Sequence, residues 1–356
     1  MGYTPASSLG CSRAARLPAM SSSIRTPLAG EADIAEKLVS VLQQHFSQPI
    51  RVARVRPLAG HLHSTYLIRL TNETHLLLKC SPCPTTPLLR REHVLLDTEA
   101  RALSLLNRSA LPCIPKLFYY DPMGQFLGPT SLVRCHIQGS TLADAEAQFT
   151  GQDRRALDRS LGILAKRIAQ HTSDSFGSLG QVAGAAGKKS WREAFLVLFE
   201  CLLRDSEDVF INLPYGEIRY HVGRLSPVLD EISRPRLVVV DFGQPSQVVV
   251  DPETRRLCGI SGFGTAVWGD VYMARMFENP STSMVDGFGS SFPRTHMGRT
   301  RQLLYVFPPL HIEGGDSNGA FISSGMHATA RYIRLFYSTI GETETRLLRS
   351  MRGDSS

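Results

Sequence analysis

The sequence predicts an α+β fold of two lobes, in which a small antiparallel β-sheet with one helix precedes a larger, mainly helical lobe. Three observations support this prediction: short strand patterns between residues 51 and 79, a helix at about 92–107 with a carboxylate on its apolar stripe, and mostly helical patterns after residue 139. A chain of 356 residues is long enough for two lobes with a sizeable core.

Three candidate strands begin the first lobe. Residues 51–56 alternate Val with Arg or Ala, residues 65–70 are rich in strand-forming side chains, and residues 74–79 form a short apolar run that ends at Lys79. The loop between the first two strands contains one glycine. Its backbone amides and the hydroxyl of Ser64 are therefore candidates for contacting a phosphate group.

The helix expected at 92–107 contains an acidic residue in an unusual place. Glu99 lies four residues from both Leu95 and Leu103, inside the apolar stripe. A carboxylate on a buried stripe is unfavourable unless a cation pairs with it. We expect that cation to be Lys79; the alternative is a surface lysine and a tolerated helix charge.

The second lobe is expected to begin where Gln138-Gly-Ser-Thr-Leu142 interrupts the strand pattern. The predicted division is a disordered leader or transit peptide at 1–30, a first lobe at 31–137 and a second lobe at 138–350. Helical spacing covers 153–171, and a capping box at Ser190 precedes another apolar helix. A short hairpin is expected within 236–261.

The composition is that of an ordinary globular protein, with 42% hydrophobic and 20% charged residues. No apolar run is long enough to span a bilayer, and the net charge of +7 is scattered along the chain, so neither a membrane nor a nucleic-acid partner is predicted. Seven widely spaced cysteines indicate reduced thiols in an intracellular compartment. We expect the cytoplasm, with mitochondria as the alternative.

The order of these parts is informative. A glycine-containing loop, a strand lysine, a helix glutamate, a lobe junction and an aspartate after a buried strand follow one another as in proteins that transfer phosphoryl groups. Asp241, which follows the strand at 237–240, is that aspartate.

Residues 50 to about 275 resemble the aminoglycoside phosphotransferase and choline kinase superfamily, in particular its fungal phosphotransferase enzyme family, whose fold is related to protein kinases. The segment from Arg236 to Thr254 carries the match, together with Gly259-Ile-Ser-Gly-Phe-Gly264 and Ala266-Val-Trp-Gly-Asp270. The resemblance implies ATP and Mg²⁺ as cofactors and a small-molecule substrate. It also implies roles for individual residues: Lys79 on the ATP phosphates, Glu99 orienting Lys79, Asp241 positioning the substrate hydroxyl, and Gln247 as a metal ligand.

Several positions depart from the family pattern. Val239 stands where the family has His, Gln247 or Ser246 where it has a metal-binding Asn, and Gly262 where it has a metal-binding Asp. Magnesium requires oxygen ligands, and a glycine side chain supplies none. In an alternative register, Asp241-Phe-Gly243 is itself the metal motif, but residues 221–236 lack the His-x-Asp arrangement that this register requires.

Two functions follow from these features. The first is ATP-dependent phosphorylation of a small-molecule hydroxyl, in the setting of fungal secondary metabolism. The second is a catalytically inactive pseudoenzyme of the same fold that acts as a binding or regulatory protein; the substitutions at Val239 and Gly262 favour it.

Overall fold

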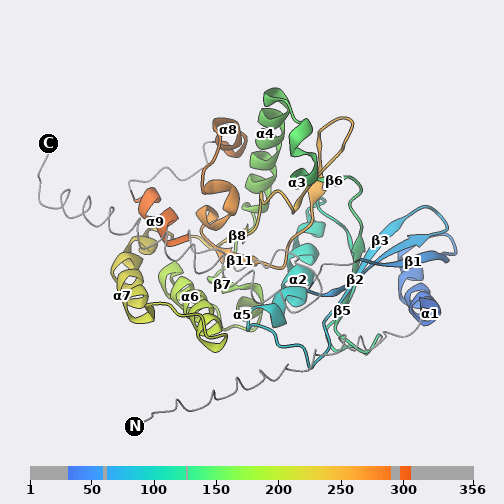
Figure 1. The fold of residues 1–356 in the computed structure, drawn as a ribbon, viewed down its shortest axis with the longest axis horizontal. Helices are drawn as coiled ribbons and strands as arrows, with labels where there is room; N and C mark the ends of the chain where they lie inside the picture. The colour runs from blue at the N-terminus through green and yellow to red at the C-terminus, as the bar shows by residue number, and fades with distance from the viewer. Residues whose placement is uncertain (1–30, 59–61, 126, 290–296, 306–356) are drawn as a thin grey trace, which may run out of the picture.

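The structure is a computed structural model that describes residues 31–58, 62–125, 127–289 and 297–305 (Figure 1). It contains the two predicted lobes. The N-terminal lobe is built on one five-stranded antiparallel sheet, and the C-terminal lobe consists mainly of helices with two three-stranded sheets.

The N-terminal sheet contains β1 (Val52–Leu58), β2 (Ser64–Leu70), β3 (His75–Cys80), β4 (Leu117–Asp121) and β5 (Ser131–Cys135), in the order β1-β2-β3-β5-β4. The register places Lys79 opposite Thr65 on one side and Leu132 on the other. Side chains alternate between the two faces of each strand, so Lys79, Leu77 and His75 share one face, and Leu76, Leu78 and Cys80 share the other.

The helix α1 (Glu31–Leu42) covers the face that carries Leu76 and Leu78. Its buried residues Ile34, Leu38 and Leu42 recur every four positions and form a cluster with that face. Sequence reasoning identified one helix in this lobe, and α1 is a second one.

The predicted helix is α2 (Leu95–Arg108), preceded by a 3₁₀-helix at Glu92–Val94. It packs on the opposite face of the sheet, over β4 and β5, where Leu96 and Ala100 cluster with Leu132. Because α2 covers this half of the face, Glu99 is brought next to the strands that carry Lys79 and Arg134.

The helices of the C-terminal lobe pack around one large core cluster. Thr150 and Asp153 form a capping box at the start of α4, and the Ser190 hydroxyl accepts a hydrogen bond from the backbone N–H of Glu193 at the start of α6. The helices are α3 (Leu142–Ala145), α4 (Gly151–Ile168), α5 (Leu179–Ala183), α6 (Trp191–Asp208), α7 (Tyr215–Leu225), α8 (Thr282–Phe288) and α9 (Gly298–Tyr305).

Close contact between α4 and α8 depends on glycine. A Cβ on Gly162 would lie 2.2 Å from the carbonyl oxygen of Met284, which no side chain could tolerate. Besides Glu92–Val94, the 3₁₀-helices of the described residues are Gln43–His45, Glu146–Gln148, Ser226–Glu231, Val271–Met273 and Arg275–Phe277.

Two small sheets lie in the C-terminal lobe. One contains β7 (Gly177–Ser178), β11 (Ala266–Gly269) and β8 (Arg236–Val239); the other contains β6 (Ser140–Thr141), β9 (Val248–Val250) and β10 (Leu257–Ile260). The β9–β10 pair is the predicted hairpin, and β6 with α3 begins at the interruption near residue 140. The lobe boundaries chosen from the sequence stay a prediction.

The predicted leader or transit peptide at 1–30 lies outside the described residues, as does the end of the predicted second lobe from residue 306. Among the helices that the structure describes, none has the length and apolar character required to cross a bilayer.

Candidate functional site

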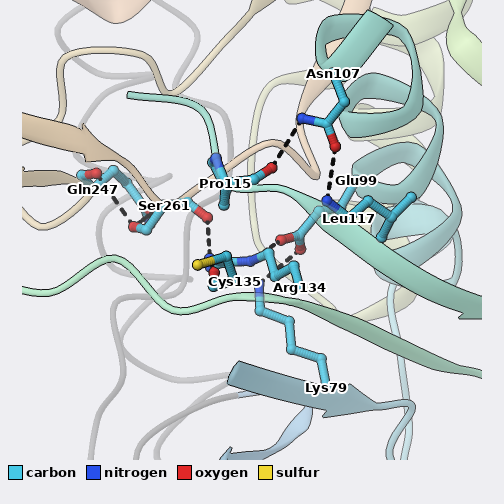
Figure 2. Close-up of polar contacts among 9 residues, drawn as sticks. All are labelled: Lys79, Glu99, Asn107, Pro115, Leu117, Arg134, Cys135, Gln247 and Ser261. Carbon is cyan, nitrogen blue, oxygen red and sulfur yellow. Dashed lines mark hydrogen bonds and ion pairs between the residues drawn. The ribbon is translucent and has the colours of Figure 1, made fainter. Parts of the chain in front are cut away.

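The centre of the candidate site is an ion pair between β3 and α2. Lys79 Nζ donates to Glu99 Oε2 at 2.7 Å, and the Glu99 side chain is 4% exposed (Figure 2). The alternating pattern of β3 directs Lys79 toward α2, and the helical stripe directs Glu99 toward the sheet. The predicted ion pair is therefore confirmed.

A second cation, which sequence reasoning missed, binds the same carboxylate. Arg134 of β5 donates from Nε to Glu99 Oε1 at 2.9 Å and is as deeply buried as Glu99. Its other nitrogens donate to the carbonyl oxygens of Cys135 and Ser261, at 3.1 and 3.2 Å. Arg134 therefore ties α2 to the segment that follows the β9–β10 hairpin (Figure 2).

The charges of this cluster shift the pKa values of its members. Burial alone would raise the pKa of Glu99, but Lys79 and Arg134 outweigh burial and hold that pKa below its ordinary value. Burial lowers the pKa of Lys79, and Arg134 lowers it further, against the opposing effect of Glu99. The Glu99 carboxylate thus pairs with both Lys79 and Arg134, and the three side chains together carry a net positive charge.

Beyond Arg134, the site continues to Gln247 and Gly262. The Ser261 hydroxyl donates to Gln247 Oε1 at 2.8 Å (Figure 2). A Cβ on Gly262 would lie 2.5 Å from the same Oε1 atom. The Gln247 carboxamide therefore occupies the space that a side chain at position 262 would need.

Asp241 lies in a turn directly after β8 and is 3% exposed. Its backbone N–H donates to Thr265 Oγ1 at 3.3 Å, and its carbonyl accepts from the backbone N–H of Gln244 at 3.1 Å. Asp241 precedes the β9–β10 hairpin and Gly262 follows it, which is the chain order of the preferred register. Gln247 and Asp241 thus lie at the two ends of one short loop.

Arg91, which sequence reasoning did not identify as a site residue, lies close enough to Asp241 for an electrostatic interaction with its carboxylate. Burial lowers the pKa of Arg91 to about 10, while Glu92, Asp241 and Asp205 oppose that change. Arg91 Nε is buried and has no hydrogen-bond partner among the described residues. A fixed positive charge therefore accompanies the candidate catalytic carboxylate.

Comparison of the sequence with protein-family models and with curated proteins finds no match. Solved structures share the arrangement of lobes and elements. A candidate fructosamine-3-kinase from Thermobifida fusca has 18% identity and a TM-score of 0.55, covering 85% of this chain and 98% of that chain. The streptomycin–ATP–APH(2″)-IIa ternary complex has 16% identity and a TM-score of 0.53, covering 85% and 96%. The chain has the aminoglycoside phosphotransferase fold.

A third structure with this fold is a thermostable mutant of aminoglycoside phosphotransferase APH(4)-Ia in complex with ADP and hygromycin B. It has 14% identity and a TM-score of 0.53, covering 85% of this chain and 98% of that chain. At these identities the likeness establishes the aminoglycoside phosphotransferase fold alone.

Within this fold, two residues close to Asp241 in the chain, Val239 and Phe242, belong to the core. Val239 ends β8, pairs with Ala266 and is 2% exposed, and Phe242 is equally buried. The position that holds His in the resembled family is thus an apolar part of the core here.

Gly243, two residues after Asp241, adopts a left-handed backbone conformation with φ +88°, and a Cβ at this position would lie 2.6 Å from Met276 Cβ.

Ser64, a candidate phosphate-contacting residue from the sequence, lies on the face of the sheet opposite to Lys79. It is exposed at the start of β2 and pairs with Cys80, so its side chain leaves the sheet on the α1 face, opposite to Lys79. Thr65, which is buried and pairs with Lys79, has the hydroxyl on the Lys79 face and donates to the carbonyl of His63. Residues 59–61 of the predicted phosphate loop lie outside the described residues.

Asp270 anchors the loop that follows β11. Its carboxylate accepts from the backbone N–H of Tyr272, from Arg301 Nε at 3.0 Å and from the Tyr305 hydroxyl at 3.0 Å. Tyr305 in turn accepts from Trp191 Nε1 at 2.7 Å. This buried network fastens α9 to α6 and to the loop after β11.

The two cysteines of the Cys80-Ser-Pro-Cys83 segment lie in different surroundings. Cys80 is fully buried and Cys83 is exposed. Burial raises the pKa of Cys80 to about 12, which keeps its thiol protonated. Within the described part of the chain, no group of three or more His, Cys, Asp and Glu side chains is arranged to hold a metal ion.

Proposed function

We propose that this protein is a non-catalytic member of the aminoglycoside phosphotransferase fold, which binds a ligand at the Lys79–Glu99–Arg134 cluster and transfers no phosphoryl group. The observation that carries this proposal is the packing of Gln247 against Gly262. A Gln amide, held by Ser261, fills the place where the resembled family has a metal-binding carboxylate.

The residues present do not fit Mg²⁺. This ion prefers several hard oxygen ligands in octahedral geometry, usually including carboxylates. Gly262 offers no side-chain oxygen, and Gln247 Oε1 already accepts a hydrogen bond from Ser261. Loss of one preorganised group that stabilises transition-state charge costs about 10²–10³ in rate, so loss of a metal carboxylate is expected to cost at least as much.

A second candidate function is ATP-dependent phosphorylation of a small-molecule hydroxyl. The formed Lys79–Glu99 pair and the position of Asp241 before the hairpin favour it. In this case Lys79 would contact phosphate oxygens and Asp241 would orient the acceptor hydroxyl. The acceptor, and a place in fungal secondary metabolism, stay predictions.

A turnover measurement distinguishes the two functions. We expect the purified protein, with ATP and Mg²⁺ or Mn²⁺, to release no more phosphate than its Lys79→Met variant. The double variant Gln247→Asn/Gly262→Asp, which returns a carboxylate and an amide to the positions that carry them in the resembled family, serves as the comparison. Turnover by the wild type above the Lys79→Met background would contradict the non-catalytic proposal and support the kinase.

A further inference from the structure

The face of the N-terminal sheet that carries Lys79 is strongly basic beyond the site described above. Cross-strand pairing puts Arg56, Leu67, Leu77 and Arg134 in one row across β1, β2, β3 and β5. A neighbouring row contains Arg54, Arg69 and His75, and the backbone N–H of His136 donates to the carbonyl of His75 at 2.9 Å. We call Arg54, Arg56, His75, His136, Lys79 and Arg134 the basic face.

Acidic residues do not neutralise this face. The sequences of β1, β2, β3 and β5 contain no Asp or Glu. Glu73, in the turn after β2, pairs with Arg69, and Glu99 is shared between Lys79 and Arg134. The positive charges of Arg54 and Arg56 are therefore not offset by an acidic residue of these strands.

The positive charges of this face act on the imidazole of His136. Burial lowers the pKa of His136, and the positive charges of Arg134, His75 and Arg56 lower it further. Three different strands thus contribute charge to the surroundings of one imidazole. Arg54 and Arg56 are exposed, and His75 and His136 are half-buried, so the face is accessible from solvent.

The dimensions suit a small ligand. Neighbouring strands lie about 4.8 Å apart, so a row from β1 to β5 spans roughly 14 Å, and two rows two residues apart add about 7 Å. Proteins that bind single-stranded nucleic acids stack the bases on aromatic side chains. Tyr66 of β2 lies on the α1 face, so in β1–β3 the basic face has no Phe, Tyr or Trp on which a base could stack. Guanidinium groups recognise phosphate oxygens in a bidentate manner.

We propose that the basic face binds a small molecule carrying two or more phosphate groups without a divalent cation, with Arg54, Arg56, His75 and His136 contacting phosphates and Lys79 and Arg134 at the inner end. The inference rests on the proposed non-catalytic function, because side-chain cations here take over the neutralising role of a metal ion. It extends that function by naming the ligand class.

Calorimetric titration with sodium tripolyphosphate, in EDTA and separately in Mg²⁺, tests the proposal. We expect binding in EDTA that Mg²⁺ does not strengthen, because Mg²⁺ reduces the charge of the probe. The variant Arg54→Gln/Arg56→Gln should weaken binding at least tenfold. Arg155→Gln, which changes an exposed arginine of α4, should leave it unchanged; circular dichroism verifies that both variants fold.

Parallel titrations with ATP and AMP identify the source of the phosphates. Similar affinity for ATP and tripolyphosphate would assign recognition to the phosphate chain, and tighter binding of ATP would assign part of it to the nucleoside. Histidine-selective NMR supplies a second readout: a bound polyanion should raise the pKa of His136, whereas a purely structural basic face would leave it unchanged.

Absence of binding in EDTA for every probe, or equal binding by the Arg54→Gln/Arg56→Gln variant, would overturn the proposal. Failure here is distinct from failure of the proposed function, which is decided by phosphate release from ATP. A protein that binds only in Mg²⁺ and turns over would refute both, and one that neither binds nor turns over would refute only the ligand assignment.

Discussion

Arg134 Nε lies 2.9 Å from Glu99 Oε1 in an interior where both side chains are 4% exposed. Lys79 approaches the second carboxylate oxygen of Glu99. Buried ion pairs are costly to break, because removal of one partner leaves the other charged group desolvated and uncompensated. The stability of the N-terminal lobe therefore depends on the Glu99 charge.

Glu99→Gln should destabilise the fold by about 3–5 kcal/mol, the usual effect of breaking a buried pair. Urea denaturation measures this as a lower midpoint. The matched control is Glu73→Gln, which removes the acid of the exposed Arg69–Glu73 pair and should leave the midpoint unchanged. Equal effects of the two substitutions would show that the buried cluster contributes no special stability.

The pH dependence of stability should carry the signature of Glu99. Its pKa is lower in the folded protein than the ordinary 4.5, so below about pH 4.5 the unfolded chain binds a proton that the folded chain does not. The stability from Glu99 is fully present above that pH and is lost as pH falls through the folded pKa. The loss between pH 5 and 3 should be smaller in Glu99→Gln, and parallel pH profiles would refute the assignment.

The contact between positions 247 and 262 should appear as coupling between two substitutions. Gly262→Asp alone forces the Gln247 amide away from Ser261 and should cost about 1 kcal/mol, the usual net contribution of one hydrogen bond, because this pair is half-buried. Gln247→Asn, one methylene shorter, should recover part of this loss in the double variant. Strict additivity in a double-mutant cycle would mean that the two side chains do not compete for the same space.

The anchor of α9 should be sensitive to one hydroxyl. Tyr305→Phe removes the acceptor of Trp191 Nε1 and one donor to Asp270, and both partners are buried, so a cost of about 1–3 kcal/mol is expected. Tyr220→Phe, at an exposed tyrosine of α7, is the control. Thermal unfolding followed by circular dichroism measures both variants, and an unshifted melting temperature for Tyr305→Phe would contradict the anchoring role.

The pairing of Lys79 with Glu99 was predictable because a carboxylate on a buried helical stripe requires a cation, and the preceding strand ends in one. The strands, α2 and the hairpin followed from local patterns. The signal for α1 was also present, in apolar residues at 34, 38 and 42. Local patterns were therefore sufficient for most of the N-terminal lobe.

The remaining parts of the site depend on relationships that sequence spacing does not contain. Arg134 reaches Glu99, 35 positions earlier, only because of the β3–β5 register and the placement of α2. The contact between Gln247 and Gly262 depends on the conformation of the loops at the base of a hairpin. Arg91 lies between elements, where no periodic pattern indicates which way a side chain points.

Arg134 connects Glu99 of α2 to the carbonyl oxygen of Ser261, and this connection limits how far α2 can move when a ligand binds. An outward swing of α2 would expose the buried side chains of Arg134 and Glu99 at once, and the cost of separating this buried ion pair opposes such a movement. A ligand that reaches Lys79 meets a preorganised surface and spends little binding energy on induced fit. Association should therefore follow one kinetic phase, governed by electrostatic attraction and sensitive to ionic strength.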